Sequence, residues 1–142
     1  MDFYEEGVLF FLTAIEGSVV LPQVPVTVKD ANGKSIWEAY PDFLALNFKK
    51  RQIQILEVSK SNNKDTIKKL VEKADQKYRN IVEKHVREEI LKGELDEFLF
   101  DWRFFVRKQE VESLKQKIDK LGCIAEVNSI EAIFESIMQR MP

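Results

Sequence analysis

The first segment with a clear hydrophobic period covers residues 3–16. Its apolar side chains recur at the spacing of a helix with one buried face, and Gly17 suits the C-terminal cap of that helix. The same spacing predicts two later helices, at residues 110–121 and 128–138. These three segments are therefore expected to lie against a common core.

A longer helical pattern covers residues 62–91 in the middle of the chain. Asn62 begins it, and Asp65 three residues later gives an arrangement like a capping box. An apolar stripe then runs at a period of 3.6 residues, with a break expected near His85. We therefore expect one long amphipathic helix here, interrupted close to its end.

Several other segments are rich in β-branched and aromatic residues and lack a helical period. They are predicted strands at residues 18–28, 35–47, 52–58, 98–106 and 124–127. Pro22 and Pro25 favour an edge position for the first, and Pro41 interrupts the second. The predicted order is α-β-β-β-α-β-α-β-α. It indicates an α/β protein with a mixed sheet and helices on both of its faces.

The length and composition narrow the class of protein. A chain of 142 residues fits one domain, so residues 1–142 are taken as a single unit. The single cysteine, Cys123, cannot form an internal disulfide, and no Cys/His pair has zinc-ligand spacing. The first helix opens with acids, and its apolar run is too short to cross a bilayer, so no membrane contact and a cytoplasmic location are expected.

Two acidic residues interrupt apolar strands. Asp42 follows Pro41 in AYPDFLAL, and Glu57 lies fifteen residues later in IQILEVSKS. An acid inside such a segment carries a desolvation cost unless another group offsets it. A divalent cation bound by both carboxylates would do so, and Mg²⁺ takes one or two carboxylates together with water and phosphate oxygens. Lys60 is the nearby base that could orient a metal-bound water.

The alternative explanation for these two acids involves no metal. Asp42 would then cap the turn after Pro41, and Glu57 would lie at a solvated end of its strand.

The segment PDFLALNFKKRQIQILEVSKS resembles the catalytic motif of the PD-(D/E)XK, or restriction-endonuclease-like, nuclease superfamily. The resemblance covers residues 3–108, where the predicted α-β-β-β-α-β order is that of the family's core, and leaves 109–142 as a C-terminal extension. It implies that Asp42 and Glu57 bind Mg²⁺ or Mn²⁺. An acid of the first helix often joins such a site, and Glu5 is preferred to Glu6 because it shares a face with apolar residues.

The sequence departs from the family pattern at the lysine. The family places its lysine two residues after the acid, where this chain has Ser59, and Lys60 follows. Strand alternation directs Lys60 to the opposite face unless the strand ends or bulges at Ser59. The departure therefore weakens the expectation of cleavage more than the expectation of metal binding.

Charge is distributed unevenly along the chain. The whole sequence has 22 Lys and Arg against 24 Asp and Glu, yet residues 48–92 hold 13 against 7, a net charge of +6. A basic segment beside the acids suggests a local surface for a phosphate backbone, and an ordinary solvated helix face remains the alternative. The candidate DNA-binding side chains are Lys64, Lys68, Lys69 and Lys73.

Three functions are compatible with these features. The first is a metal-dependent DNA endonuclease that hydrolyses phosphodiester bonds, with homodimerisation implied by the resemblance because two strands need two sites. The second is a catalytically degenerate protein of the same fold that binds DNA or a protein partner, which the Ser59 departure favours. The third is an unrelated α/β interaction domain in which the two acids are incidental.

Overall fold

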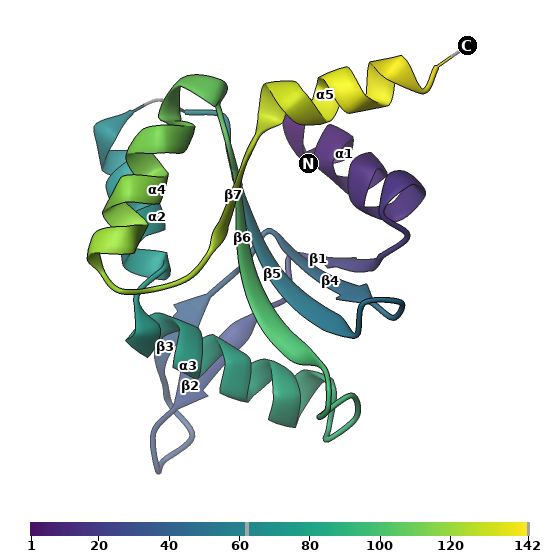
Figure 1. Cartoon of the computed structure of the whole chain (residues 1–142). Helices are drawn as coiled ribbons and strands as arrows, with labels where there is room; N and C mark the ends of the chain where they lie inside the picture. The colour runs from purple at the N-terminus through teal and green to yellow at the C-terminus, as the bar shows by residue number, and fades with distance from the viewer. Residues whose placement is uncertain (62, 142) are drawn as a thin grey trace.

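A computed structural model describes residues 1–61 and 63–141 as a mixed α/β fold with a five-stranded sheet and a separate two-stranded sheet (Figure 1). The strands are β1 (Val19–Pro22), β2 (Val26–Lys29), β3 (Ser35–Ala39), β4 (Phe43–Asn47), β5 (Gln52–Ser59), β6 (Leu99–Val106) and β7 (Glu126–Ser129). The α-helices are α1 (Phe3–Phe10), α2 (Lys64–Lys73), α3 (Gln76–His85), α4 (Val111–Lys120) and α5 (Ile130–Gln139). Two π-helical turns, η1 (Phe11–Ile15) and η2 (Val86–Ile90), and a 3-10 turn, η3 (Lys108–Glu110), extend or precede helices.

The five-stranded sheet has the order β1-β4-β5-β6-β7. The pairs β1/β4 and β4/β5 are antiparallel, whereas β5/β6 and β6/β7 are parallel. The parallel pairs need crossovers, which α2 with α3 and then α4 provide. The mixed sheet expected from the sequence is therefore confirmed.

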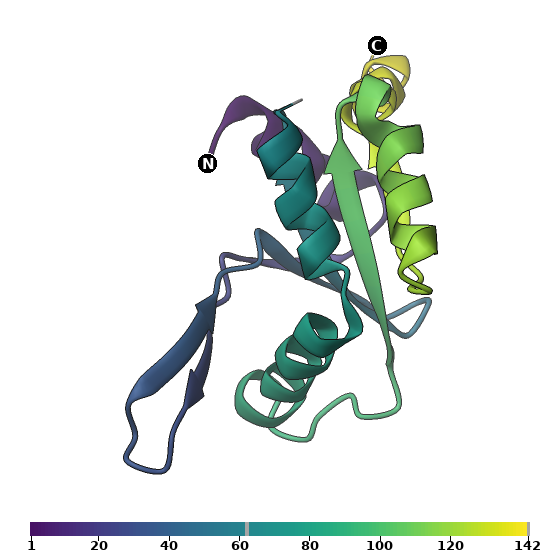
Figure 2. The ribbon, with the colours of Figure 1, turned by 90° about the vertical axis from the view of Figure 1, so that its left-hand side faces the viewer.

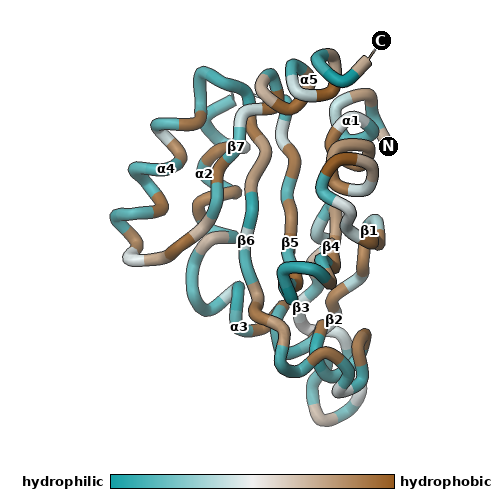
Figure 3. Tube along the Cα trace, turned by 45° about the vertical axis from the view of Figure 1, so that its right-hand side comes forward, coloured by the Kyte–Doolittle hydropathy of each residue, from teal (hydrophilic) through white to brown (hydrophobic). Residues whose placement is uncertain are grey.

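Helices cover both faces of this sheet. On one face, β5 and β6 side chains pack against α2, α3 and α4, with Trp102 and Phe104 at the centre. On the other face, Leu56 and Phe105 pack against α1 and α5. Figure 3 shows hydrophobic residues recurring along the central strands, and consecutive apolar residues such as Ile55 and Leu56 are buried on opposite faces of the sheet.

The chain passes from one sheet to the other next to its prolines. Residues 18–28 were expected to form one strand, but β1 ends at Pro22 and β2 begins after Pro25 in the second sheet. Residues 35–47 likewise divide at Pro41, with β3 pairing with β2 and β4 pairing with β1. Because proline lacks a backbone N–H, each break falls where the ladder must stop. The β2–β3 hairpin extends from the body as an arm (Figure 2).

The central helical segment breaks earlier than the sequence suggested. The α-helix ends at His85, close to the predicted break, and continues as the π-helical turn η2, but a further break that the sequence did not indicate separates α2, ending at Lys73, from α3, beginning at Gln76. The Asp75 side chain caps α3 by accepting a hydrogen bond from the backbone N–H of Lys77, a competing start signal inside the apolar stripe. Asn62, the predicted first residue, lies outside the described residues, and Asn63 caps α2.

Within residues 1–61 and 63–141, no helix is long and apolar enough to cross a bilayer.

Candidate functional site

The β4–β5 hairpin brings Asp42 and Glu57 together. Phe43 pairs with Leu56 in the antiparallel register, so the next step places Asp42 opposite Glu57. Directly opposite residues of an antiparallel pair point to the same face. Both carboxylates are therefore directed to the sheet face that α2 and α3 cover, as a shared binding site requires.

Glu57 is a buried charge with few partners. Its relative exposure is 3%, so the explanation that placed it at a solvated strand end is wrong. The Nζ atom of Lys73 on α2 lies 3.1 Å from Glu57 Oε1 and forms an ion pair with it. Among the described residues, Oε1 has no partner with the geometry of a hydrogen bond. Buried carboxylate oxygens are usually hydrogen-bonded, which makes this one an exception.

The protonation of Glu57 reflects this shortage of partners. The pKa of Glu57 is raised to about 8, first by burial and then by the Asp42 charge and a hydrogen bond with Asp42, while the Lys73 ammonium opposes the increase. The carboxyl group is thus protonated near neutral pH unless additional positive charge reaches it. A bound cation would supply that charge.

Backbone contacts fix the position of Asp42. Its Oδ2 atom accepts a hydrogen bond of 2.8 Å from the N–H of Val58 in β5. Its carbonyl accepts a bond of 2.9 Å from the N–H of Gln23, which adopts a φ of 50° in the turn after β1. Gln23 thereby holds the β1 side of the sheet against the residue that starts β4, although its own side chain is exposed.

Helix α1 contributes a third acid at the edge of this pair. Glu5 is half-buried, and burial followed by the charges of Asp42 and Asp2 raises the pKa of Glu5. Glu6, the other candidate on this helix, is exposed and lines a groove between α1 and α5. The arrangement favours Glu5 over Glu6 as a companion of Asp42.

Lys60 lies beyond the end of β5, at the rim of the site. Its Nζ atom pairs with Asp2 Oδ2 at 3.4 Å, and its side chain is exposed. The lysine that contacts the central carboxylate is instead Lys73, which sequence analysis assigned only to DNA binding. No local motif signals this contact, because it depends on how α2 packs across β5.

Tyr78 of α3 lies near Glu57 and Asp42. Its hydroxyl group is buried and has no hydrogen-bond partner among the described residues. Burial first, and then the charges of Glu57 and Asp42, raise the pKa of Tyr78 well above its usual value. The phenol is therefore a neutral donor held close to two carboxylates.

A cleft of about 470 Å³ is lined by residues 37–40 at the end of the β2–β3 arm and by residues of α2 and α3. Trp37 and Tyr40 come from the arm, and Lys69, Lys73 and Tyr78 come from the helices. Lys73 thus borders both the cleft and the buried carboxylate. A substrate group that enters the cleft would meet a lysine before it reaches Glu57.

The other lysines of α2 face solvent. Lys64, Lys68 and Lys69 are exposed, while Ile67 and Leu70 of the same helix are buried. The polar face of α2 is thus available to an anionic ligand.

The neighbouring carboxylates of this site repel one another, and a divalent cation bound between them would offset that repulsion. Asp42 and Glu57 supply two carboxylates, Glu5 lies within electrostatic range of Asp42, and Glu57 Oε1 lacks a donor. Mg²⁺ commonly binds one or two carboxylates and fills its remaining positions with water. Within residues 1–61 and 63–141, no three His, Cys, Asp or Glu side chains gather closely enough to form a full metal cage.

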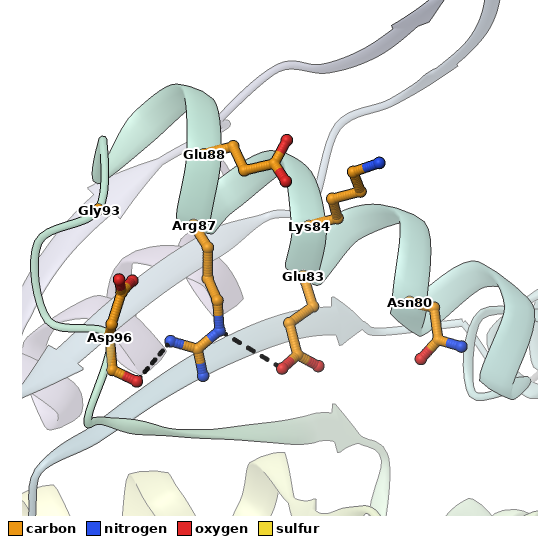
Figure 4. A pocket seen from close by; sticks show the side chains of 7 residues that line it. All are labelled: Asn80, Glu83, Lys84, Arg87, Glu88, Gly93 and Asp96. Carbon is orange, nitrogen blue, oxygen red and sulfur yellow. Dashed lines mark hydrogen bonds and ion pairs between the residues drawn. The ribbon is translucent and has the colours of Figure 1, made fainter.

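A second cavity, of about 560 Å³, lies at the far end of α3 (Figure 4). Arg87 donates hydrogen bonds to the carbonyls of Asp96 and Phe98, at 3.2 and 2.9 Å, and its Nε lies 3.6 Å from a Glu83 oxygen. These contacts tie the loop before β6 to the helix. The cavity is therefore best explained as a structural junction.

No protein-family model matches this chain, and no curated protein sequence matches it either.

Proposed function

We propose that the protein is a divalent-metal-dependent DNA endonuclease whose site is built on Asp42 and Glu57. The observation that carries the proposal is the pairing of these carboxylates on one face of the β4–β5 hairpin, with Glu57 buried and short of donors. The α-β-β-β-α-β order of α1, β1, β4, β5, α2 with α3, and β6 supports it, because the PD-(D/E)XK resemblance implies that order.

The chain's residues have separate roles in this proposal. Asp42 and Glu57 hold Mg²⁺ or Mn²⁺, with Glu5 accepting a hydrogen bond from a water of the ion. When bound, the ion lowers the pKa of a coordinated water and stabilises negative charge on a phosphodiester. Lys73 positions the scissile phosphate at the mouth of the cleft, where it also offsets the charge of Glu57.

DNA would approach along the exposed side of α2. Lys64, Lys68 and Lys69 contact backbone phosphates, which gives affinity without sequence preference. Lys60, paired with Asp2 at the rim, is available to a flanking phosphate rather than to the attacking water.

The experiment is a cleavage assay on plasmid, single-stranded and branched DNA in Mg²⁺, Mn²⁺ or EDTA. We expect cleavage with metal and none in EDTA, and loss of cleavage in Asp42→Ala and Glu57→Ala. Glu94→Ala, an exposed acid in the loop before β6, is the matched control and should cleave normally. Metal-dependent cleavage that survives both site substitutions would refute the proposal.

A second candidate function is a DNA-binding module that keeps the fold without cleaving. The observation that favours it is the Lys73–Glu57 ion pair, since an ammonium already occupies one side of the carboxylate. In that case DNA binding in EDTA would depend on the α2 lysines, with no cleavage and no shift in Tm on addition of Mn²⁺. Metal-dependent cleavage that Asp42→Ala abolishes would exclude it.

A further inference from the structure

Helices α1 and α5 lie side by side on the sheet face opposite the candidate site (Figure 1). Gly7 permits this close approach, because a Cβ atom at that position would lie 2.3 Å from the ring of Phe134. Phe3 stacks on the same ring at a centroid distance of 5.1 Å. The two helices thus pack against each other into one continuous surface, which we call the α1–α5 platform.

The outer surface of this platform is apolar. Phe3 and Phe10 of α1 are 70% and 52% exposed, Met141, which lines the same groove, is 66% exposed, and Met138, one helical turn after Phe134 in α5, is 68% exposed. Phe3 and Phe10 are seven residues apart, so they lie on the same side of the helix. A groove of about 540 Å³ runs between the helices, with Ala14 and Ile137 among its lining residues.

We propose that a second copy of this chain docks on the α1–α5 platform to form a twofold symmetric homodimer. The exposed parts of the two phenylalanines and two methionines amount to about 500 Å² per copy, near the upper range for the largest apolar patch of a monomer. Two such patches bury about 1,000 Å², the area at which a specific interface becomes stable.

The charges on the platform favour a second copy over other partners. Glu6 and Arg140 both line the groove, so the surface carries one charge of each sign. Neither residue has an ion-pair partner among the described residues. A twofold axis places Glu6 of each copy against Arg140 of the other, which makes the surface complementary to itself.

An anionic membrane fits this surface less well. Glu6 in the groove would face the anionic headgroups, and Arg140 is the single base among the residues that line the groove. Helices that lie on anionic membranes are instead rich in Lys and Arg on their polar face.

The platform is linked to the candidate site through α1. This helix presents Phe3 and Phe10 to the platform and Glu5 to the Asp42 side. Dimerisation would thus hold α1, and with it Glu5, in place in both copies. The inference does not depend on the proposed nuclease activity, because the apolar platform lies outside the carboxylate site.

The test is sedimentation velocity of the full chain over a wide range of concentration. We expect a monomer–dimer equilibrium, and about a tenfold or larger rise in the dissociation constant in Phe10→Glu and in Met138→Glu. Ile124→Glu, which replaces an 81% exposed apolar residue in the loop before β7, is the matched control and should dimerise normally. Circular dichroism and Tm confirm that each variant is folded.

A charge exchange tests the symmetry itself. Glu6→Arg and Arg140→Glu should each weaken the dimer, and the double variant should restore it, because each pair then exists again with reversed signs. Mn²⁺ binding is also measured for the monomeric variants. A variant that binds Mn²⁺ normally but does not dimerise has lost the interface and has kept the metal site. A monomer at all concentrations, a dimer that persists in both apolar variants, or vesicle binding that Phe10→Glu abolishes would overturn the proposal.

Discussion

Two buried charges lie on neighbouring strands of the sheet and differ in how well they are satisfied. Glu57 of β5 and Arg103 of β6 are 3% and 4% exposed. Arg103 donates two hydrogen bonds to the Glu16 carboxylate, at 2.6 and 3.2 Å, and one of 2.6 Å to Asn128. Its guanidinium also lies 4.8 Å from the Phe105 ring centroid. Glu57, on the opposite face, forms an ion pair with Lys73 alone among the described residues, and the Oε1 atom of that pair has no partner with the geometry of a hydrogen bond.

The difference teaches that burial alone does not identify a functional charge. The N–H groups of Arg103 find acceptors within the chain, and these hydrogen bonds link η1, β6 and β7. The Arg103 network therefore needs no ligand to stabilise its charge. The Glu57 environment supplies one ammonium group and too little further stabilisation of the carboxylate, so burial raises the pKa of Glu57 to about 8. A buried carboxyl group with a perturbed pKa and few partners is the feature that distinguishes a candidate binding site from a well-satisfied structural ion pair.

The largest expected effect concerns Arg103. Arg103→Met should lower the free energy of unfolding by about 3–5 kcal/mol, because it leaves Glu16 without its buried partner. Urea denaturation measures the change. Arg51→Met, which breaks the exposed pair with Glu97, is the control and should cost less than about 1 kcal/mol. Equal losses in the two variants would contradict the structural role of Arg103.

The next effect concerns the pH dependence of stability at Glu57. Because its pKa rises from 4.5 to about 8 on folding, the native state holds a proton that the unfolded state has lost between those values. Stability from this group is therefore full at low pH and falls as pH rises through that window.

Glu57→Gln removes this pH-dependent cost. In EDTA, the variant should gain on the order of 3 kcal/mol relative to the natural chain between pH 5 and pH 9, or roughly 10 °C in Tm. Thermal melts across that range measure it. A difference that stays constant with pH would show that Glu57 is ionised throughout and already satisfied, like Arg103.

A third prediction separates the two lysines near the carboxylates. Lys73→Met should lower the cleavage rate about 100-fold, whereas Lys60→Met should change it only a few-fold, because Lys73 contacts Glu57 and Lys60 contacts Asp2. Single-turnover kinetics with saturating protein measure the rates. A larger loss of cleavage rate in Lys60→Met than in Lys73→Met would indicate that Lys60 is the functional lysine.

The smallest effects belong to the solvated lysines of α2. Lys68→Gln and Lys69→Gln should each weaken DNA binding modestly and reduce the slope of log K against log salt by about 1. Fluorescence anisotropy in EDTA measures both quantities. Lys117→Gln on α4, exposed and outside the basic segment, should leave the slope unchanged.

The sequence was sufficient for features that depend on local pattern. Hydrophobic period predicted the helices, the central strands and the mixed sheet, and interruption of apolar strands identified Asp42 and Glu57. Antiparallel alternation then placed both acids on one face, since a short turn joins β4 to β5.

The features that sequence analysis missed depend on contacts between distant segments. The exchange of strands between two sheets at Pro22 and Pro41 depends on which strand each segment meets, which no local signal records. Lys73, the last residue of α2, contacts Glu57 of β5 because of how α2 packs across the sheet, which no local signal records either. Arg103 and Glu16 are separated by 87 residues and share no motif.

The β4–β5 hairpin also has a consequence for how the protein folds. Its two strands are joined by a short turn, so Asp42 and Glu57 can meet in a local structure that forms on a microsecond timescale. The β5–β6 pairing instead joins Gln52 to Leu99 across α2 and α3, and such long-range contacts form slowly. We therefore expect the two acids to be assembled while still hydrated, with desolvation of Glu57 imposed by the later docking of β6 and α2.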